Sequence, residues 1–199
     1  MVNRKNLRKK YVLISTFDKK NLKYLCNNLN NLGYNFISSG VTGSKIRSFG
    51  FECIDISKLT KSKEMFDGRV KTLNHLIYSS LLYIRSNKDH IKQFHSLKIP
   101  AIDIVVVNLY PFKKYSKKQN KEQIIEMIDI GGPSLLRAAA KNFKYITPII
   151  EIKDYKKLIE NLKKNNGLTD VSFRKKMAAK IFKQISEYDN YIFNWINEN

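Results

Sequence analysis

Residues 102–107 have the sequence IDIVVV, a nearly continuous run of β-branched residues. Such a run is typical of a strand that is buried on both faces of a parallel sheet. Asn108, Leu109, Tyr110 and Pro111 follow at its predicted carboxyl end. In an open parallel sheet, the loops at this end of the strands form the ligand crevice. The stretch therefore indicates both the fold class and the place of a site.

The chain before residue 102 alternates between strand and helix signals. Short apolar runs and amphipathic stretches follow one another, separated by glycines, and this pattern predicts a βαβαβ unit. Two later helices, over 75–83 and 89–97, are expected to cover one face of the sheet. Within the βαβαβ unit, strands are expected over 11–15, 34–37 and 51–56, helices over 19–32 and 45–49, and a Gly- and Ser-rich turn over 38–44.

Helical patterns dominate after residue 107. Pro133, after the break at Gly131 and Gly132, fits the first turn of a helix. The pattern predicts an α/β fold in one domain over 11–199, preceded by a basic extension over 1–10. The expected elements are helices over 122–127, 134–144, 155–164 and 172–196 and a strand over 145–150. The last helix carries Phe173, Met177, Ile181, Ile185 and Tyr188 at helical spacing, which is typical of a core-facing stripe.

The composition excludes several classes of protein. A chain of 199 residues with 43% hydrophobic content can bury one sizeable core. No apolar stretch approaches the roughly 18 residues of a membrane helix, and no signal-peptide cleavage site follows the basic N-terminus, so a cytoplasmic protein is expected. Cys26 and Cys53 suggest no disulfide framework. Because His75, His90 and His95 lack metal-ligand spacing, no metal is expected.

The charge is strongly positive, with 37 Lys plus Arg against 17 Asp plus Glu and a net charge of +20. Such a balance raises the question of nucleic-acid binding. Lys, Asn and Ile are abundant throughout the chain without forming a stripe, which favours a compositional bias over a binding surface. We therefore expect no specific nucleic-acid partner, although a positive field would attract an anionic, phosphorylated substrate.

Polar residues gather after the predicted strands. The loop after the second strand combines hydroxyls, glycines and a following helix, which can hold a phosphate or can be a purely structural turn. The segment around Arg69, Lys71 and Thr72 carries two cations with no acidic residue nearby beyond Asp67, and it could be a solvated loop. Asp129 precedes a predicted helix and could simply cap it. The candidate residues at strand ends are Ser15, Lys19, Ser39, Gly40, Thr42, Asn108 and Tyr110.

Four stretches resemble one known family, the IMP cyclohydrolase half of the bifunctional purine-biosynthesis protein PurH. They are GRVKTL over 68–73, VVNLYPF over 106–112, IDIGGPSLLRAAAKN over 128–142 and the helix over 173–196. The resemblance runs from about residue 11 to residue 196 and stops where the formyltransferase half would begin. It implies a fold like that of methylglyoxal synthase, with a parallel sheet and helices on both faces.

The resemblance also implies a reaction, the closure of 5-formamidoimidazole-4-carboxamide ribotide to IMP with loss of water and without metal or cofactor. Asp129 and Lys141 would organise the attacking carboxamide, and Lys71 and Tyr110 would act near the formyl group. It leaves open a homodimer and a separate formyltransferase polypeptide. The residues implied for substrate binding are Ser15, Lys19, Ser39, Gly40, Thr42, Arg69, Thr72 and Asn108, with the N–H groups of Ile130 and Gly131 as oxyanion donors.

Three positions depart from the family's pattern. Phe17 replaces a serine, Val41 replaces a glycine, and Asn74 with His75 replaces a His-Pro pair. Val41 would be costly if its position required a positive φ. The alternative function is a non-catalytic domain of the same fold that binds a phosphorylated ligand. Such a domain needs the phosphate loop but not the set of Lys71, Tyr110, Asp129 and Lys141.

Overall fold

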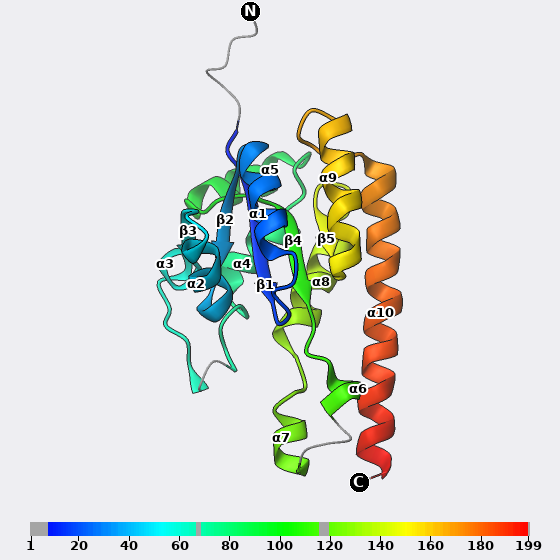
Figure 1. Cartoon of the computed structure of the whole chain (residues 1–199). Coiled ribbons are helices and arrows are strands. Elements are labelled where there is room, and N and C mark those ends of the chain that lie inside the picture. Colours follow the sequence, from blue (N-terminus) through cyan, green and yellow to red (C-terminus); the bar gives the residue numbers. More distant parts are fainter. Residues whose placement is uncertain (1–7, 67–68, 116–119, 199) are drawn as a thin grey trace, which may run out of the picture.

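The structure is a computed structural model that describes residues 8–66, 69–115 and 120–198. Within these residues, five parallel strands form one sheet in the order β3-β2-β1-β4-β5 (Figure 1). The predicted α/β fold with a parallel sheet is confirmed. The strands are β1 (Lys10–Thr16), β2 (Tyr34–Ser38), β3 (Cys53–Asp55), β4 (Ile102–Asn108) and β5 (Thr147–Ile149). No helix within the described ranges is long and apolar enough to cross a membrane.

The helices pack around this sheet. They are α1 (Leu22–Asn31), α2 (Gly40–Ser48), α3 (Ile56–Thr60), α4 (His75–Leu82), α5 (Lys88–Ser96), α6 (Phe112–Tyr115), α7 (Lys121–Ile125), α8 (Gly131–Lys141), α9 (Tyr155–Lys164) and α10 (Val171–Glu198). A 3₁₀ helix over Ile152–Asp154 precedes α9. The short elements α3 and α6 and the 3₁₀ helix were not expected from the sequence, because runs this short give only a weak periodic pattern.

Two predicted helices begin earlier than the sequence indicated. The turn expected over 38–44 is mostly the first part of α2, and the expected break at Gly131 and Gly132 is the first turn of α8. Pro133 lies in that first turn, where its missing N–H would have no helical partner in any case. Glycines that look like breaks in the sequence therefore lie inside the N-terminal turns of two helices.

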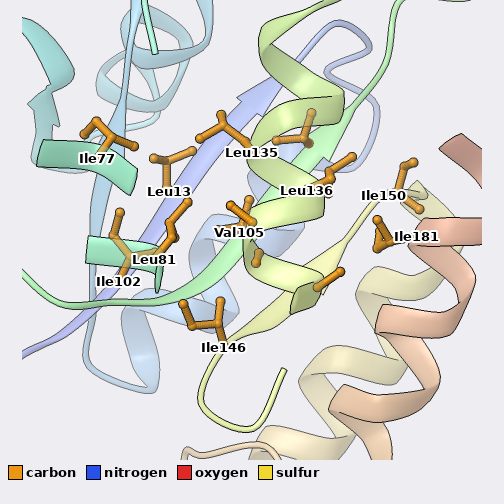
Figure 2. Close-up of a cluster of buried hydrophobic side chains, with 14 of the residues drawn as sticks. Leu13, Ile77, Leu81, Ile102, Val105, Leu135, Leu136, Ile146, Ile150 and Ile181 are labelled. Atoms are coloured by element: carbon orange, nitrogen blue, oxygen red, sulfur yellow. The ribbon is translucent and has the colours of Figure 1, made fainter. Parts of the chain in front are cut away.

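The two faces of the sheet carry separate hydrophobic clusters among the described residues. Val12 and Ile14 point to the face covered by α1, α2 and α9. Leu13, between them, points to the opposite face, where Ile77 of α4 and Leu136 of α8 pack against Val105 of β4. Figure 2 shows this second cluster. Alternate residues of β1 thus enter opposite cores, which buries β1 on both faces as β4 is buried.

The long helix α10 lies along the β5 edge of the sheet. Its Met177 joins the first cluster, whereas Ile181 and Ile185 join the second. Figure 1 shows the C-terminal half of α10 running past β5 to lie beside α6. Lys180 fastens the helix through ion pairs with Glu151 and with Asp154, which is 2% exposed. The helix therefore covers an edge strand that would otherwise be open.

The amino end of the central strands is held by a buried carboxylate. Asp103 of β4 forms ion pairs with Arg8 and Arg85, the latter at 2.8 Å, and accepts a hydrogen bond from Tyr11 N–H at 3.1 Å. The predicted basic extension over 1–10 is therefore partly packed, because Arg8 binds Asp103 and Lys10 begins β1. Residues 1–7 lie outside the described part of the chain.

Candidate functional site

The carboxyl ends of β1 and β4 lie side by side, because the pairing of these strands continues to Thr16 and Asn108. Both polar atoms of the Asn108 side chain form hydrogen bonds there. Its Oδ1 accepts hydrogen bonds from Phe17 N–H at 2.6 Å and Asp18 N–H at 2.9 Å, and its Nδ2 donates to Asp18 O at 2.9 Å. Asn108 therefore fixes the loop after β1, with both polar atoms of its side chain bonded to residues 17 and 18.

Thr42 connects the same loop to α2. Its hydroxyl donates to Thr16 O at 3.0 Å and accepts from Thr16 N–H at 3.3 Å, and the side chain is buried. Ser39 is the N-cap residue of α2, and its side chain makes no capping hydrogen bond within the described residues. The first helical hydrogen bond is donated by Gly43 N–H to Ser39 O. The N–H groups before it have no helical partner, which suits an anion.

Lys71 reaches over the start of α2. Its Nζ lies 3.5 Å from the point where a Cβ atom on Gly40 would be, and Gly40 has a φ of +51°. Lys71 also forms a 3.2 Å ion pair with Glu64. Arg69 pairs with Glu126, its Nε lying 3.2 Å from Oε2. The expectation that these cations lack acidic partners beyond Asp67 was wrong, because the partners come from outside the motif.

Thr72 and Asp129 meet at the N-terminus of α8. Thr72 Oγ1 lies 3.0 Å from the position of a Cβ on Gly131, and Asp129 Oδ1 accepts a hydrogen bond from Gly132 N–H at 2.8 Å. A Cβ on Gly132 would lie 2.4 Å from Asp129 Oδ2. A side chain at 132 would therefore displace the carboxylate of Asp129. Asp129 does cap the helix, as the simpler interpretation expected.

The carboxyl group of Asp129 is protonated more readily than an exposed aspartate. Burial raises its pKa because the charged form loses hydration, and the hydrogen bond from Gly132 N–H opposes this rise. Ile130 and Gly131 follow at the start of α8, where backbone N–H groups point out of the helix. A proton acceptor and potential oxyanion donors are therefore adjacent in the chain.

Tyr110 and Lys19 lie toward β5. The ring of Tyr110 packs against that of Phe17 with centroids 5.0 Å apart. Lys19 Nζ donates to the carbonyls of Thr16 and Phe17, and burial lowers the pKa of Lys19, an effect that Asp18 partly opposes. Lys19 lines a cavity of about 780 Å³ between the loops after β1, β4 and β5. Tyr110 lines a neighbouring cavity of about 430 Å³ against α10.

The structure does not place Lys141 with these residues. Lys141 is the last residue of α8 and is exposed, whereas Asp129 precedes the first residue of that helix. Eleven residues of helix span about 15 Å from the first residue to the last. The predicted pairing of Asp129 with Lys141 is therefore not found. Ser15 also lies away from these residues, because it is inside the sheet, where it pairs with Val107.

The departures from the family's pattern have local explanations. Val41 is 75% exposed in the first turn of α2 and does not have a positive φ. Asn74 is the N-cap residue of α4, and its Oδ1 accepts a hydrogen bond from Leu76 N–H at 2.9 Å. Neither Val41 nor Asn74 has a positive φ. Phe17 packs on Tyr110 and so changes the surface beside the site.

Sequence reasoning missed Glu64 and Glu126, and it interpreted Tyr188 only as part of a core stripe. Tyr188 accepts a hydrogen bond from Asp129 N–H at 2.8 Å. The two residues are 59 positions apart, and no local spacing signals such a contact. The stripe of α10 did predict that Tyr188 faces inward.

The chain belongs to the family of MGS-like domains. Its parallel sheet, with polar loops at the carboxyl edge, agrees with this class. The model of that family matches residues 21–134. A second model, the AICARFT/IMPCHase bienzyme, matches residues 139–199. The two matches together cover most of the chain.

Proteins named bifunctional purine biosynthesis protein PurH are relatives of this chain. The chain is 44% identical over 190 residues to that of Caldicellulosiruptor saccharolyticus, covering 94% of the chain and 36% of the relative. It is 43% identical to that of Clostridium botulinum, covering 95% of the chain and 38% of the relative. The resemblance to PurH is thus confirmed, and the chain spans somewhat more than a third of these relatives' length.

A solved structure titled "Crystal structure of ForH" has the same fold. It superposes with a TM-score of 0.86 at 28% sequence identity, covering 94% of this chain and 97% of that chain. The methylglyoxal-synthase-like fold is therefore confirmed over nearly the whole chain.

Proposed function

We propose that the protein is an IMP cyclohydrolase that closes 5-formamidoimidazole-4-carboxamide ribotide to IMP. The carboxamide nitrogen attacks the formyl carbon, so that a new C–N bond closes the ring. The formyl oxygen then leaves as water and takes up two protons, one lost by the attacking carboxamide nitrogen and one lost by the former formamide nitrogen. An amide is a poor nucleophile and a formamide a poor electrophile, so the site must position both groups and move protons.

The observation that carries the proposal is the convergence of three segments at the carboxyl edge of the sheet. Lys71 lies against Gly40, and Thr72 lies against Gly131. Asp129 is hydrogen-bonded at the start of α8. The convergence brings a cation, a hydroxyl, a carboxylate and two helix N-termini to one place, although these residues are far apart in the sequence.

Each group fits a step of the reaction. A carboxyl group with a raised pKa suits Asp129 to take the proton of the attacking amide near neutral pH. The N–H groups of Ile130 and Gly131 are suited to stabilise the oxyanion formed from the formyl group. Lys71 would supply positive charge near the formyl group, and Tyr110 would donate a hydrogen bond there.

The phosphoribosyl part would bind at the start of α2. The unpaired N–H groups there, with Ser39, Gly40 and the backbone of Thr42, suit a phosphate. Arg69 adds positive charge, although it would have to exchange Glu126 for the ligand. Lys19 would have to turn away from the cavity toward β5 to reach the same place. The formyl group itself must be installed by a formyltransferase, which we assign to the part of the PurH relatives that this chain does not span or to a separate polypeptide.

The test is to incubate the purified protein with the formamido ribotide and follow IMP by absorbance. We expect turnover that persists in a chelator, because the proposal assigns every step to side chains and backbone groups. Asp129→Asn is the matched control, since an asparagine amide oxygen can still accept the hydrogen bond from Gly132. Ligand binding without IMP formation by the unaltered protein would favour the non-catalytic alternative and refute the proposal.

A further inference from the structure

The helix α10 contacts the turn that carries Asp129. The hydroxyl of Tyr188 accepts a hydrogen bond from Asp129 N–H at 2.8 Å and donates one to Met127 O at 3.3 Å. These two bonds lie on either side of Ile128, in the turn between α7 and α8. A single phenol group thus fixes both ends of a three-residue segment that no helix includes.

The ring of Tyr188 also contacts the loop that carries Tyr110. Phe112 is 2% exposed and packs edge-on against Tyr188, with centroids 6.3 Å apart. Phe112 N–H donates to Tyr110 O at 2.8 Å, so its position constrains that of Tyr110. One side chain of α10 is therefore in contact with two of the three segments that supply proposed catalytic groups, those of Tyr110 and Asp129.

The hydroxyl of Tyr188 is suited to a permanent structural bond. It is half-buried, and this burial raises the pKa of Tyr188 to about 12, so the hydroxyl keeps its proton at neutral pH. It can then donate and accept at the same time. Among the described residues, the carboxylate of Asp129 accepts a hydrogen bond only from Gly132 N–H. Tyr188 holds the backbone N–H of the same residue, so this bond is a main determinant of where the carboxylate points.

We propose that Tyr188 is a positioning residue for cyclisation, one that orients Asp129 through its backbone without touching the substrate. The inference rests on the proposed function, because it gives Tyr188 a role only if Asp129 takes part in the reaction. A displacement of about 1 Å in a reacting group can reduce a rate by about 100-fold. Loss of the two hydrogen bonds should therefore affect turnover more than substrate binding.

The test compares Tyr188→Phe with Tyr191→Phe. The first variant removes the hydroxyl and keeps the ring that packs on Phe112. The second is the matched control on the same helix, because the Tyr191 hydroxyl accepts a hydrogen bond only from a surface lysine, Lys113, at 2.7 Å within the described residues. We expect Tyr188→Phe to lower kcat by about 10- to 100-fold with KM little changed, and Tyr191→Phe to leave both unchanged.

A double variant shows whether Tyr188 acts through Asp129. In an Asp129→Asn background, Tyr188→Phe should lower the residual rate no further, because the group it positions is already gone. Equal kcat values for Tyr188→Phe and Tyr191→Phe would overturn the inference while leaving the proposed function intact, and so would an undiminished effect in the double variant. Absence of IMP formation by the unaltered protein would instead overturn the proposed function and this inference with it.

Discussion

The carboxyl group of Asp129 combines a capping bond with partial burial, and the two have opposite effects on its charge. Burial favours the neutral form, whereas the hydrogen bond from Gly132 N–H favours the ionised form. Burial has the larger effect, so the pKa in the folded protein exceeds the unfolded value of about 3.9. The stability that this group contributes is therefore complete below about pH 3.9 and is lost as the pH rises through the folded pKa.

Asp129→Asn should remove this pH dependence. We expect the variant to be at least as stable as the unaltered protein at neutral pH, because asparagine can keep the cap without a buried charge. At pH 4 the advantage should shrink, because a larger fraction of the aspartate is neutral there than at neutral pH. Urea unfolding of both proteins from pH 4 to pH 8 measures the difference. A variant that is destabilised more at neutral pH than at pH 4 would show that the pKa shift has the opposite sign.

Lys141 provides a second test at a single residue. Its place at the C-terminus of α8 suggests that it interacts with the helix dipole, which is worth about 0.3–1 kcal/mol. Lys141→Ala should therefore lower the free energy of unfolding slightly and leave turnover nearly intact. Lys71→Ala should reduce turnover by about 100-fold or more if Lys71 stabilises charge in the transition state. Similar losses of turnover in both variants would return Lys141 to the site.

The sequence indicated candidate residues for the site, but not the contacts that these residues make. Motif resemblance pointed to Lys71, Tyr110 and Asp129, and the rule for strand ends pointed to Asn108. Neither could show that Lys71 pairs with Glu64 or that Thr42 has its hydroxyl occupied by Thr16. Such contacts depend on how loops fold over one another, which local spacing does not encode.

At the scale of elements, the strands were predicted because they are short apolar runs, and the longer helices because each has a clear periodicity. The predicted bounds of α9 agree with the structure, since its apolar residues Tyr155, Leu158, Ile159 and Leu162 recur at helical spacing. The starts of α2 and α8 were missed, because glycine has a low helix propensity. In α8 the cap from Asp129 and the contact with Thr72 support the glycines, and both are tertiary or capping effects.

The attachment of α10 to the β5 edge depends on Lys180. Lys180→Met leaves the carboxylate of Asp154 buried without its cation, which should cost about 3 kcal/mol of unfolding free energy. Lys183→Met is the matched control, because its 3.9 Å pair with Glu187 is exposed and worth at most about 0.5 kcal/mol. Urea unfolding at constant pH compares the two.

A third variant separates loss of the ion pair from loss of packing. Lys180→Met combined with Asp154→Asn removes both charges and should recover part of the stability, because no buried charge is then left unpaired. If the double variant is as unstable as the sum of its single changes, the two residues are not coupled.

At the scale of the whole molecule, the net charge of +20 should produce weak association with any duplex DNA. Charges that are scattered release few counterions together, so we expect binding at low salt that disappears by about 0.15 M. Fluorescence anisotropy with two unrelated duplexes over a salt series measures this. Tight binding at 0.15 M salt, or preference for one sequence, would point to a nucleic-acid function.

The strand order also has a consequence for how the chain is made. β1 lies in the middle of the sheet between β2, which follows it closely, and β4, which begins 92 residues after the start of β1. During synthesis, β1 to β3 can assemble first, while one edge of β1 must wait for β4 to leave the ribosome. Strand β1 contains Val12, Leu13 and Ile14, which are fully buried in the folded protein. An unpaired apolar strand of this kind is prone to aggregate, so slow translation between residues 60 and 100 would lengthen the interval in which a chaperone has to shield it.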